Sequence, residues 1–476
     1  MNLKEKGITV KDLDLGTVDA EADRRLANYF IDTPQVAEAL SFRSAHFLGR
    51  KGSGKSSIFL QLPRLADAHY GESAKVSLMT PDQYAWGALR DYSEQGLLPE
   101  QAHTNAWKFT IAVDAAAALL EFDEKRFDKN ALKAFHKIRG FVTSNFGADN
   151  APTPTNTARR LLKGLGAFNL EAFGFGIGFE KDKQEQIITP QIIDLLLDAI
   201  YEVCTDLGII VATDRLDDSW DGSEVAKSLM IGLLKATKEI NDKYSESNGI
   251  GIHVVTFVRS DIYQGLQFDD KDKHRAIEEE ITWTPDLLRE MITARLPEKI
   301  SIDEIFEKGD MRGSISPFNY LVKRTFLRPR EVIQFLQECQ KRSSRNATEI
   351  SKNIIRDAEE RYSNWKVDDL KQEYRRIFPE FGELLESLRQ TQHRYDSVDD
   401  FIKLLEEKAN KLTQEFGARE LMNRLFDASV IGVRLGNAGT ARFRCEDSDL
   451  MTPTTGSVYV HQSLYKGLNI RETRAG

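Results

Sequence analysis

The sequence predicts an α/β protein whose core is a parallel sheet with helical crossovers. An apolar run at residues 45–48 leads into a glycine-rich loop and a helical pattern at residues 56–62, which Pro63 is expected to kink or end. A β-branched run at residues 209–213 ends in aspartates and precedes another helical pattern, and a further apolar run covers residues 250–258. Strands that alternate with helices in this order are typical of a parallel sheet.

Four regions are predicted along the 476 residues. They are an N-terminal helical segment at 1–44, the sheet-containing core at 45–300, a helical lid at 301–350, and a C-terminal helical and winged-helix-like region at 351–476. The last region is predicted from an apolar-faced helix at 419–433 and from a hairpin around residues 442–444 and 458–460.

An insertion is predicted within the core at about residues 147–185. It begins with a surface loop at 147–157 that holds two prolines and small polar residues. At residues 173–179 apolar side chains alternate with glycine, and a period of two predicts a strand with one bare face. Packing on the core and contact with a partner are both open interpretations of this strand.

Composition is that of an ordinary globular protein, with 41% hydrophobic and 29% charged residues. No run approaches the roughly 20 apolar residues that cross a bilayer, and the first residues lack the apolar centre of a signal peptide. We therefore expect a cytoplasmic protein without membrane contact. The three cysteines, Cys204, Cys339 and Cys445, have no metal-ligand spacing, so neither a structural metal nor a disulfide framework is expected.

The formal net charge of −9 gives the chain no overall attraction to nucleic acid. Any DNA contact would need a local basic patch. Residues 419–476 hold eight Lys or Arg and six Asp or Glu, a net of +2. DNA contact through Arg442 and Arg444 is one interpretation of this weak excess, and protein contact is the other.

Residues 49–56 match the pattern GxxxxGK[ST] without a mismatch. Glycines in such a loop let backbone N–H groups point at phosphate oxygens, and the following helix directs its positive end at the same oxygens. We expect Lys55 to reach the β- and γ-phosphates and the Ser56 hydroxyl to bind Mg²⁺. The predicted ligands of a nucleoside triphosphate, most simply ATP, are Gly49, Arg50, Lys51, Gly52, Ser53, Gly54, Lys55, Ser56 and Ser57.

An acidic residue at the end of a neighbouring strand completes such a site. Asp214 follows the strand at 209–213 directly and is the predicted magnesium-linked carboxylate. Asp217 or Asp218 would orient or deprotonate the attacking water. The fold class is thereby narrowed to a P-loop NTPase core, and the predicted activity to ATP hydrolysis.

Two further segments carry candidate nucleotide contacts. The strand at 250–258 ends in Arg259, which would face the γ-phosphate or else pair with Asp261 at the surface. Downstream, Pro329 is predicted to begin a helix, which places Arg330 in its first turn. A cation is disfavoured there by the helix dipole, which hints at an external anion such as the nucleotide.

In their order, the motifs GRKGSGKS, DRLDD, FVRSD and RPRE resemble the STAND and KAP groups of P-loop ATPases, which are similar to the origin-recognition branch of AAA+ proteins. The resemblance covers roughly residues 15–345. It implies that Asp214 is the magnesium aspartate, that Asp218 stands where STAND proteins often have glutamate, and that Arg259 is a sensor. It also implies that Pro329 and Arg330 belong to a lid that contacts the nucleotide.

An aspartate at position 218 is one methylene shorter than that glutamate, which makes slow, switch-like turnover plausible. The resemblance further implies a homo-oligomer, an effector protein as partner, and a role in bacterial antiphage defence. A DNA-dependent ATPase and a nucleotide-binding protein without turnover are the alternatives; stimulation of turnover by DNA would favour the first of these, and the intact Lys55, Asp214 and Asp218 oppose the second.

Overall fold

The computed structural model describes residues 3–81, 99–147, 190–218, 220–434 and 440–472. It contains two compact units. Residues Asp32–Ile281 form the first, here called the sheet unit, and Met1–Ile31 with Thr282–Gly476 form the second, here called the helical unit. The predicted insertion at 147–185 lies outside the described residues except at its first position, and the predicted boundaries at 44, 300 and 350 stay predictions.

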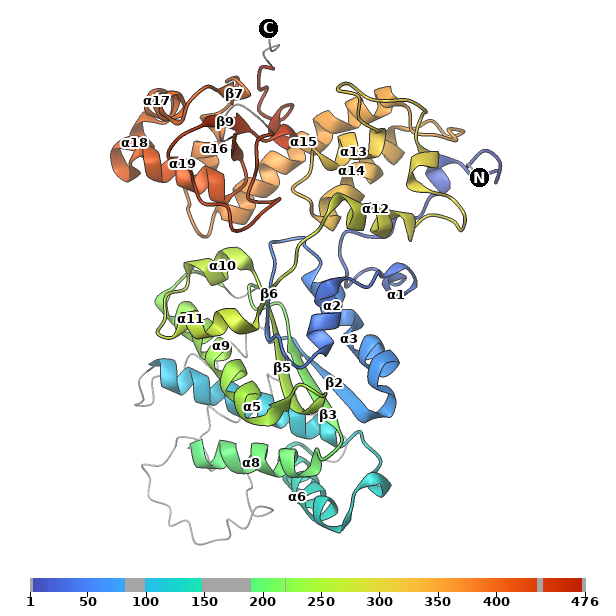
Figure 1. Ribbon diagram of the computed structural model, residues 1–476, viewed down its shortest axis with the longest axis vertical. Coiled ribbons are helices and arrows are strands. Elements are labelled where there is room, and N and C mark those ends of the chain that lie inside the picture. The colour runs from blue at the N-terminus through green and yellow to red at the C-terminus, as the bar shows by residue number, and fades with distance from the viewer. Residues whose placement is uncertain (1–2, 82–98, 148–189, 219, 435–439, 473–476) are drawn as a thin grey trace. The chain divides into compact units, whose positions relative to one another are not determined.

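The sheet unit contains the predicted parallel sheet, which confirms the fold class (Figure 1). The strand order is β2(Ala74–Met79), β3(Gly208–Thr213), β5(Ile250–Val258), β1(His46–Leu48) and β6(Glu278–Glu280), all parallel, and β4(Ser245–Glu246) pairs antiparallel with the start of β5. Strand β5 therefore lies between β1, which precedes the glycine-rich loop, and β3, which precedes the aspartates. Its Val258 is paired with Leu48 of β1, and its Thr256 is paired with Thr213 of β3.

Both faces of this sheet are covered by helices, so every residue of β3 is buried. Helix α3(Lys55–Tyr70) lies on one side of the strands, and α5(Pro99–Leu119) and α9(Glu224–Tyr244) lie on the other (Figure 1). Of the two effects predicted for Pro63, a kink or an end, the end is wrong, because α3 continues past this residue to Tyr70. The shorter helices of the unit are α2(Pro34–Leu40), α10(Ser260–Gly265) and α11(Lys271–His274).

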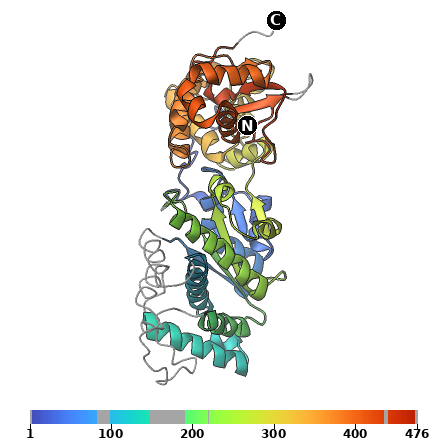
Figure 2. The same cartoon turned by 90° about the vertical axis from the view of Figure 1, so that its left-hand side faces the viewer.

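Helices α5 and α9 approach each other closely. A Cβ atom at Gly232 of α9 would lie 2.8 Å from the Cβ of His103 in α5, so only glycine fits there. The indole N–H of Trp107 donates to the Leu229 carbonyl across the same contact, at 3.0 Å. Two further helices, α6(Lys129–Phe146) and α8(Pro190–Val203), pack on α5 and on each other, at the end of the unit away from the sheet (Figures 1 and 2).

The helical unit has two hydrophobic cores that share one long helix, α15(Lys352–Tyr374). One core joins α15 to α12(Pro285–Thr293), α13(Pro317–Val322), α14(Pro329–Arg342) and the N-terminal segment. That segment is bound by main-chain and side-chain hydrogen bonds, since Val10 N–H donates to Ala347 and Gln340 donates to the carbonyl of Leu13.

The second core holds the C-terminal part of the unit. Its helices are α16(Phe381–Glu386), α17(Val398–Lys408), α18(Asn410–Phe416) and α19(Ala418–Asp427), and its sheet has the order β7(Arg394–Tyr395), β9(Ser457–Val460), β8(Ile431–Arg434). Helix and hairpin were predicted here. The predicted strand at 458–460 is confirmed by β9, but the predicted end of the helix and the strand around 442–444 are wrong. The helix ends at Asp427, and the following apolar residues form β8, which pairs with β9 in place of residues 442–444. Arg442 makes only an isolated bridge to Val433.

Among the described helices, none combines the length and the apolar character that crossing a bilayer requires.

A carboxyl group without a charged partner among the described residues is buried in the sheet unit. Asp114 of α5 is 4% exposed, and the Ser77 hydroxyl of β2 contacts it at 3.4 Å. Burial raises the pKa of this carboxyl from 3.8 to about 7, and the serine hydrogen bond opposes the shift. Asp114 therefore holds a proton in the folded protein at pH values where the unfolded chain has lost it.

We predict that Asp114→Asn removes part of the pH dependence of stability. Because the folded pKa lies above the unfolded one, the free energy of unfolding of the wild type falls as pH rises from about 4 to about 7. Urea unfolding at a series of pH values should show the variant gaining stability relative to the wild type across that window. Asp206→Asn, at an exposed position, is the control, and an equal change in both variants would contradict the assignment.

Candidate functional site

The glycine-rich loop is held by the edge of the parallel sheet. The N–H of Gly49 donates to the Val258 carbonyl at 3.0 Å, and the N–H of Ser260 donates back to Gly49 at 3.3 Å. The loop then turns through Gly52 and Gly54, whose φ angles of 81° and 99° are in the left-handed region. Gly54 caps α3, which begins at Lys55. The predicted strand, loop and helix therefore follow one another without interruption.

The loop is closed tightly on itself. A Cβ atom at Gly49 would lie 2.3 Å from the Ser53 hydroxyl and 3.2 Å from the Cγ of Lys55. The Ser53 N–H donates to the Arg50 carbonyl at 3.1 Å, and the Ser53 side chain is buried inside the turn. Lys51 in the loop and Ser57 in the first turn of α3 are partly exposed. The loop is thus a preformed cradle in which only glycine fits at position 49.

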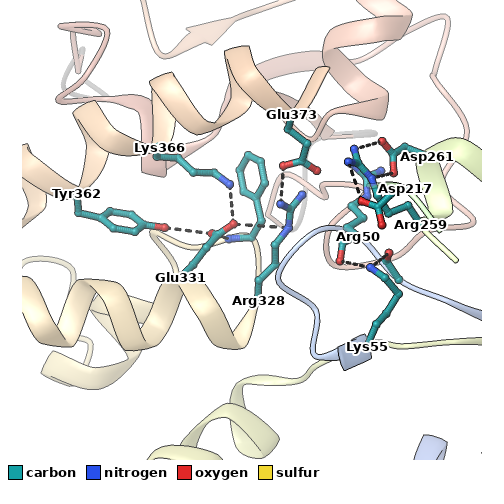
Figure 3. A network of polar contacts seen from close by, with 12 residues as sticks. Arg50, Lys55, Asp217, Arg259, Asp261, Arg328, Glu331, Tyr362, Lys366 and Glu373 are labelled. Atoms are coloured by element: carbon teal, nitrogen blue, oxygen red, sulfur yellow. Dashed lines mark hydrogen bonds and ion pairs between the residues drawn. The ribbon is translucent and has the colours of Figure 1, made fainter. Parts of the chain in front are cut away.

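Lys55 is buried, and its ammonium group donates to the carbonyls of Gly49 at 2.7 Å and Arg50 at 3.2 Å (Figure 3). Burial lowers the pKa of this ammonium group, while Asp217 and Asp214 oppose the shift. The cation is therefore fixed in a small volume beside two carboxylates, where an anion would find an oriented, partly desolvated positive charge.

Ser56 and Asp214 meet, although 158 residues separate them in the chain. The Ser56 hydroxyl in the first turn of α3 donates to the Asp214 carboxylate at the end of β3, at 2.6 Å. Asp214 is 3% exposed, and burial raises the pKa of its carboxyl against the Ser56 hydrogen bond and the Lys55 charge. Lys55, Ser56 and Asp214 therefore converge at one edge of the sheet.

The donor atoms at this edge fit Mg²⁺. Hard cations prefer hydroxyl, carboxylate and phosphate oxygens, and Mg²⁺ in nucleotide sites commonly takes only one or two carboxylates together with substrate phosphates. Ser56 and Asp214 supply one hydroxyl and one carboxylate within hydrogen-bonding distance of each other. In the described part of the chain no group of three His, Cys, Asp or Glu could hold a metal by itself, so this pair would depend on phosphate oxygens to complete the shell.

The two aspartates that follow have different surroundings. Asp217 is 31% exposed, contacts Arg259 at 3.4 Å, and is the main carboxylate that acts on the Lys55 charge. Asp218 is 50% exposed and accepts hydrogen bonds from Arg215 at 2.7 and 2.8 Å. Of the two candidates for activating water, Asp217 is the one placed beside the loop lysine.

Arg259 at the end of β5 pairs with its own neighbour. Its guanidinium, 14% exposed, contacts Asp261 at 2.6 Å and Asp217 at 3.4 Å (Figure 3). Sequence analysis left open an ion pair with Asp261 and a role facing phosphate. The structure has the ion pair, and it also places the arginine next to Asp217, beside the loop.

The RPRE motif divides into buried and partly exposed residues of the helical unit. Helix α14 begins at Pro329, as predicted from sequence, and Arg330 lies in its first turn, partly exposed and without a hydrogen bond or ion pair among the described residues. Arg328 and Glu331 are instead buried, 4% and 1% exposed. Only Arg330 in this motif is left available to an external anion.

Glu331 organises a buried network of charges (Figure 3). It accepts from the ammonium of Lys366 at 2.6 Å, the N–H of Phe326 at 2.6 Å and the hydroxyl of Tyr362 at 3.1 Å. Burial pushes the pKa of Glu331 up, but Lys366 and Arg328 hold it below its ordinary value. Sequence reasoning missed Lys366, because this partner lies 35 residues away on an otherwise ordinary helix.

Arg328 extends the network along α15. Its guanidinium contacts Glu373 at 2.9 Å and Glu331 at 3.5 Å. On the same helix Glu359 accepts from Arg324 at 2.8 Å and from Tyr320 at 2.7 Å. A tyrosine hydroxyl of α13, and charges of α14 and of the segment between the two helices, are thereby attached to the helix that both cores share. This gives the RPRE motif a structural role as well.

The two C-terminal arginines, for which DNA contact was one of two interpretations, are each paired with a carboxylate. Arg442 contacts Asp447, and Arg444 contacts Asp427 of α19 at 2.6 Å. On α19 itself Arg419 donates to the Pro453 carbonyl and Arg424 contacts Glu420. Among the described residues, each of these four arginines therefore has a partner within the helical unit.

Comparisons with known proteins give distant matches. Residues 286–371 match the family described as FunZ-associated C-terminal helical domain. Over 507 aligned residues the chain is 22% identical to an 80.3 kDa protein of the transposon gamma-delta from Escherichia coli (strain K12), and the alignment covers 98% of this chain and 68% of that protein.

Solved structures are similar at low level. The ORC2 protein of Aeropyrum pernix, in ADPNP and ADP complexes, aligns with a TM-score of 0.33 and 10% identity, over 87% of this chain and 91% of that one. Cdc6p of Pyrobaculum aerophilum aligns with a TM-score of 0.30 and 12% identity, over 95% of this chain and 93% of that one. Drosophila ORC bound to DNA aligns with a TM-score of 0.30 and 10% identity, over 92% of this chain and 84% of that chain. Likeness at this level supports no conclusion about activity.

We predict that Glu331→Gln destabilises the helical unit by about 3–5 kcal/mol, because it leaves Lys366 buried without its carboxylate. Glu338→Gln on the same helix is the matched control; its carboxylate pairs with Lys341 and Arg342 near the surface, so it should cost less than about 1 kcal/mol. Urea unfolding monitored by circular dichroism measures both variants. Equal stability of the two would contradict the structural role of Glu331.

Proposed function

We propose that the sheet unit binds ATP with Mg²⁺ in the loop at residues 49–56 and hydrolyses it. The observation that carries this proposal is the contact of Ser56 with Asp214 at 2.6 Å, next to the buried Lys55. A glycine loop alone could be a linker. A loop whose lysine, hydroxyl and distant carboxylate converge at the end of parallel strands has the parts that phosphoryl transfer requires.

Each residue of the site has a proposed task. The N–H groups of residues 50–55 and the first turn of α3 would hold the phosphates, and Lys55 would move from the loop carbonyls to phosphate oxygens. Ser56 and Asp214 would hold Mg²⁺, which when bound neutralises charge on the transferred phosphoryl group. Gly49 keeps the loop closed, since a side chain there would collide with Ser53.

We assign the positioning of the attacking water to Asp217, and not to the Asp218 that the family pattern favours. Asp217 faces Lys55 and Arg259, whereas Asp218 pairs with Arg215 at the surface. Arg259 would have to break its ion pair with Asp261 in order to contact the γ-phosphate, and breaking this pair costs free energy. An arginine held by this ion pair favours slow turnover.

Slow turnover suits a molecular switch. We therefore propose that the protein is a switch that controls a partner protein or its own assembly. Arg330, partly exposed in the first turn of α14, is the proposed lid contact to the nucleotide. Homo-oligomer formation, an effector and a role in antiphage defence are supported by the resemblance of the motifs to STAND and KAP ATPases. The mass of the protein in solution, with ATP and with ADP, tests whether assembly follows the nucleotide.

We predict that Lys55→Ala abolishes ATP binding, with at least a hundredfold weaker affinity, because the buried cation is lost from the cradle. Isothermal titration calorimetry with ATP and Mg²⁺ measures this. Lys227→Ala is the control, since Lys227 pairs with Glu224 at the start of α9. Unchanged affinity of the Lys55 variant would overturn the site.

We predict that Asp217→Asn binds ATP with nearly wild-type affinity and lowers turnover by about 10²–10⁴-fold, the usual range for loss of a general base. Asp218→Asn should retain turnover within a few-fold, because its carboxylate pairs with Arg215. Phosphate release by the purified variants compares the two. The reverse order of effects would return the role to Asp218.

A further inference from the structure

Helix α6 has a charge pattern that differs from that of the chain. Its 18 residues include three lysines, one arginine and one histidine, and no aspartate or glutamate. The whole chain has a net charge of −9. A helix without acidic residues on the surface of an acidic protein is a local positive feature, and nothing in the proposed nucleotide site uses it.

The lysines of α6 form one row. The helix buries an apolar face that includes Ala134, Phe135 and Ile138. Lys129, Lys133 and Lys137 are exposed and recur at every fourth residue, so they lie on neighbouring turns of the opposite face. At 1.5 Å rise per residue, the three positions are spaced about 6 Å apart and span about 12 Å.

No carboxylate in the described part of the chain neutralises this row. Glu124, in the turn that precedes α6, pairs with Arg139 at 2.8 Å and lies 3.5 Å from His136. Asp128 accepts from the N–H groups of Asn130 and Ala131 as the helix cap. Among the described residues, the ammonium groups of the three lysines have no ion pair, in contrast to the paired arginines of the C-terminal region.

The rest of the exposed face is polar, and it includes Asn130, His136 and Arg139. Gly140, Thr143 and Ser144 continue the same side of the helix toward its C-terminal end, with Thr143 and Ser144 exposed. The hydroxyls of Thr143 and Ser144 donate to the carbonyls of Arg139 and Phe141 in the same helix, so the lysines are the groups left to contact phosphate. The surface therefore combines positive charge with polar side chains and has no carboxylate of its own.

We propose that the lysine row of α6 binds the phosphate backbone of double-stranded DNA. Phosphates follow one strand at 3.4 Å along the helix axis, so a row of about 12 Å faces roughly three or four of them. Charge complementarity favours this occupant over an apolar partner, because the face has no large apolar side chain. The contact is independent of sequence, since lysines contact phosphate as point charges.

Salt dependence gives this proposal a quantitative form. Each neutralised phosphate contributes about −0.9 to the slope of log affinity against log salt, so three lysines give a slope of roughly −3. Removal of all three should weaken binding by a hundredfold or more at about 0.1 M salt. The net charge of −9 gives the chain as a whole no attraction to DNA, so the proposal assigns the binding to the row.

The test uses fluorescence anisotropy of a labelled DNA duplex of about 30 base pairs, with the full chain, between about 50 and 200 mM salt. The triple variant Lys129→Gln, Lys133→Gln, Lys137→Gln keeps side-chain length and helix propensity. The matched control is Lys403→Gln, Lys408→Gln, Lys411→Gln, which removes three exposed lysines of α17 and α18. Thermal melting confirms that both variants fold.

The expected result is loss of binding and of the salt slope in the α6 variant alone. Equal weakening in both variants would mean a non-specific charge effect, and would overturn the proposal. A wild type that does not bind DNA would also overturn the proposal. If that wild type self-associates and the α6 variant does not, the lysine row instead contacts an acidic surface of a second copy of the protein. Phosphate release without DNA should be the same in both triple variants, so the failure of this proposal is distinguishable from failure of the proposed ATPase.

Discussion

The backbone pairing of β5 with both β1 and β3 is the constraint on which the candidate site depends. It brings the glycine loop after Leu48 and the aspartate after Thr213 to the same edge of the sheet, because neighbouring parallel strands end together. The Ser56–Asp214 contact is a consequence of that register. It also places Arg259, which follows β5, between the other two elements, so a single strand arrangement gathers the lysine, the carboxylates and the arginine.

Much of this arrangement could be predicted because β1, β3 and β5 are continuous apolar runs with motifs at their ends. Strand β6 could not, since three consecutive glutamates at 278–280 give no pattern and pair only through the backbone. Strand β8 was assigned to a helix because its apolar run continues that of α19. The structure was also needed to choose between Asp217 and Asp218 as the residue that positions water. The two aspartates are adjacent in the sequence, and they differ in that Asp217 contacts Arg259 and Asp218 contacts Arg215.

The RPRE motif illustrates how one short segment can have two kinds of role. Glu331 and Arg328 attach α14 to α15 through buried ion pairs, and removal of one partner would leave an uncompensated buried charge. Arg330 stands outside that network. The RPRE motif resembles a set of ligands in the sequence, but in the structure Arg328 and Glu331 stabilise the packing of α14 on α15. Arg330, in the same motif, is partly exposed.

The division of the helical unit in the sequence has a consequence for the order in which the chain folds during synthesis. Residues near Val10 need Ala347 and Gln340 to complete their hydrogen bonds, and the whole sheet unit is made in between. At about 5–20 residues per second, the ribosome takes on the order of 20–60 s to cover that interval. The sheet unit can thus fold before the residues near Val10 have the partners of their hydrogen bonds.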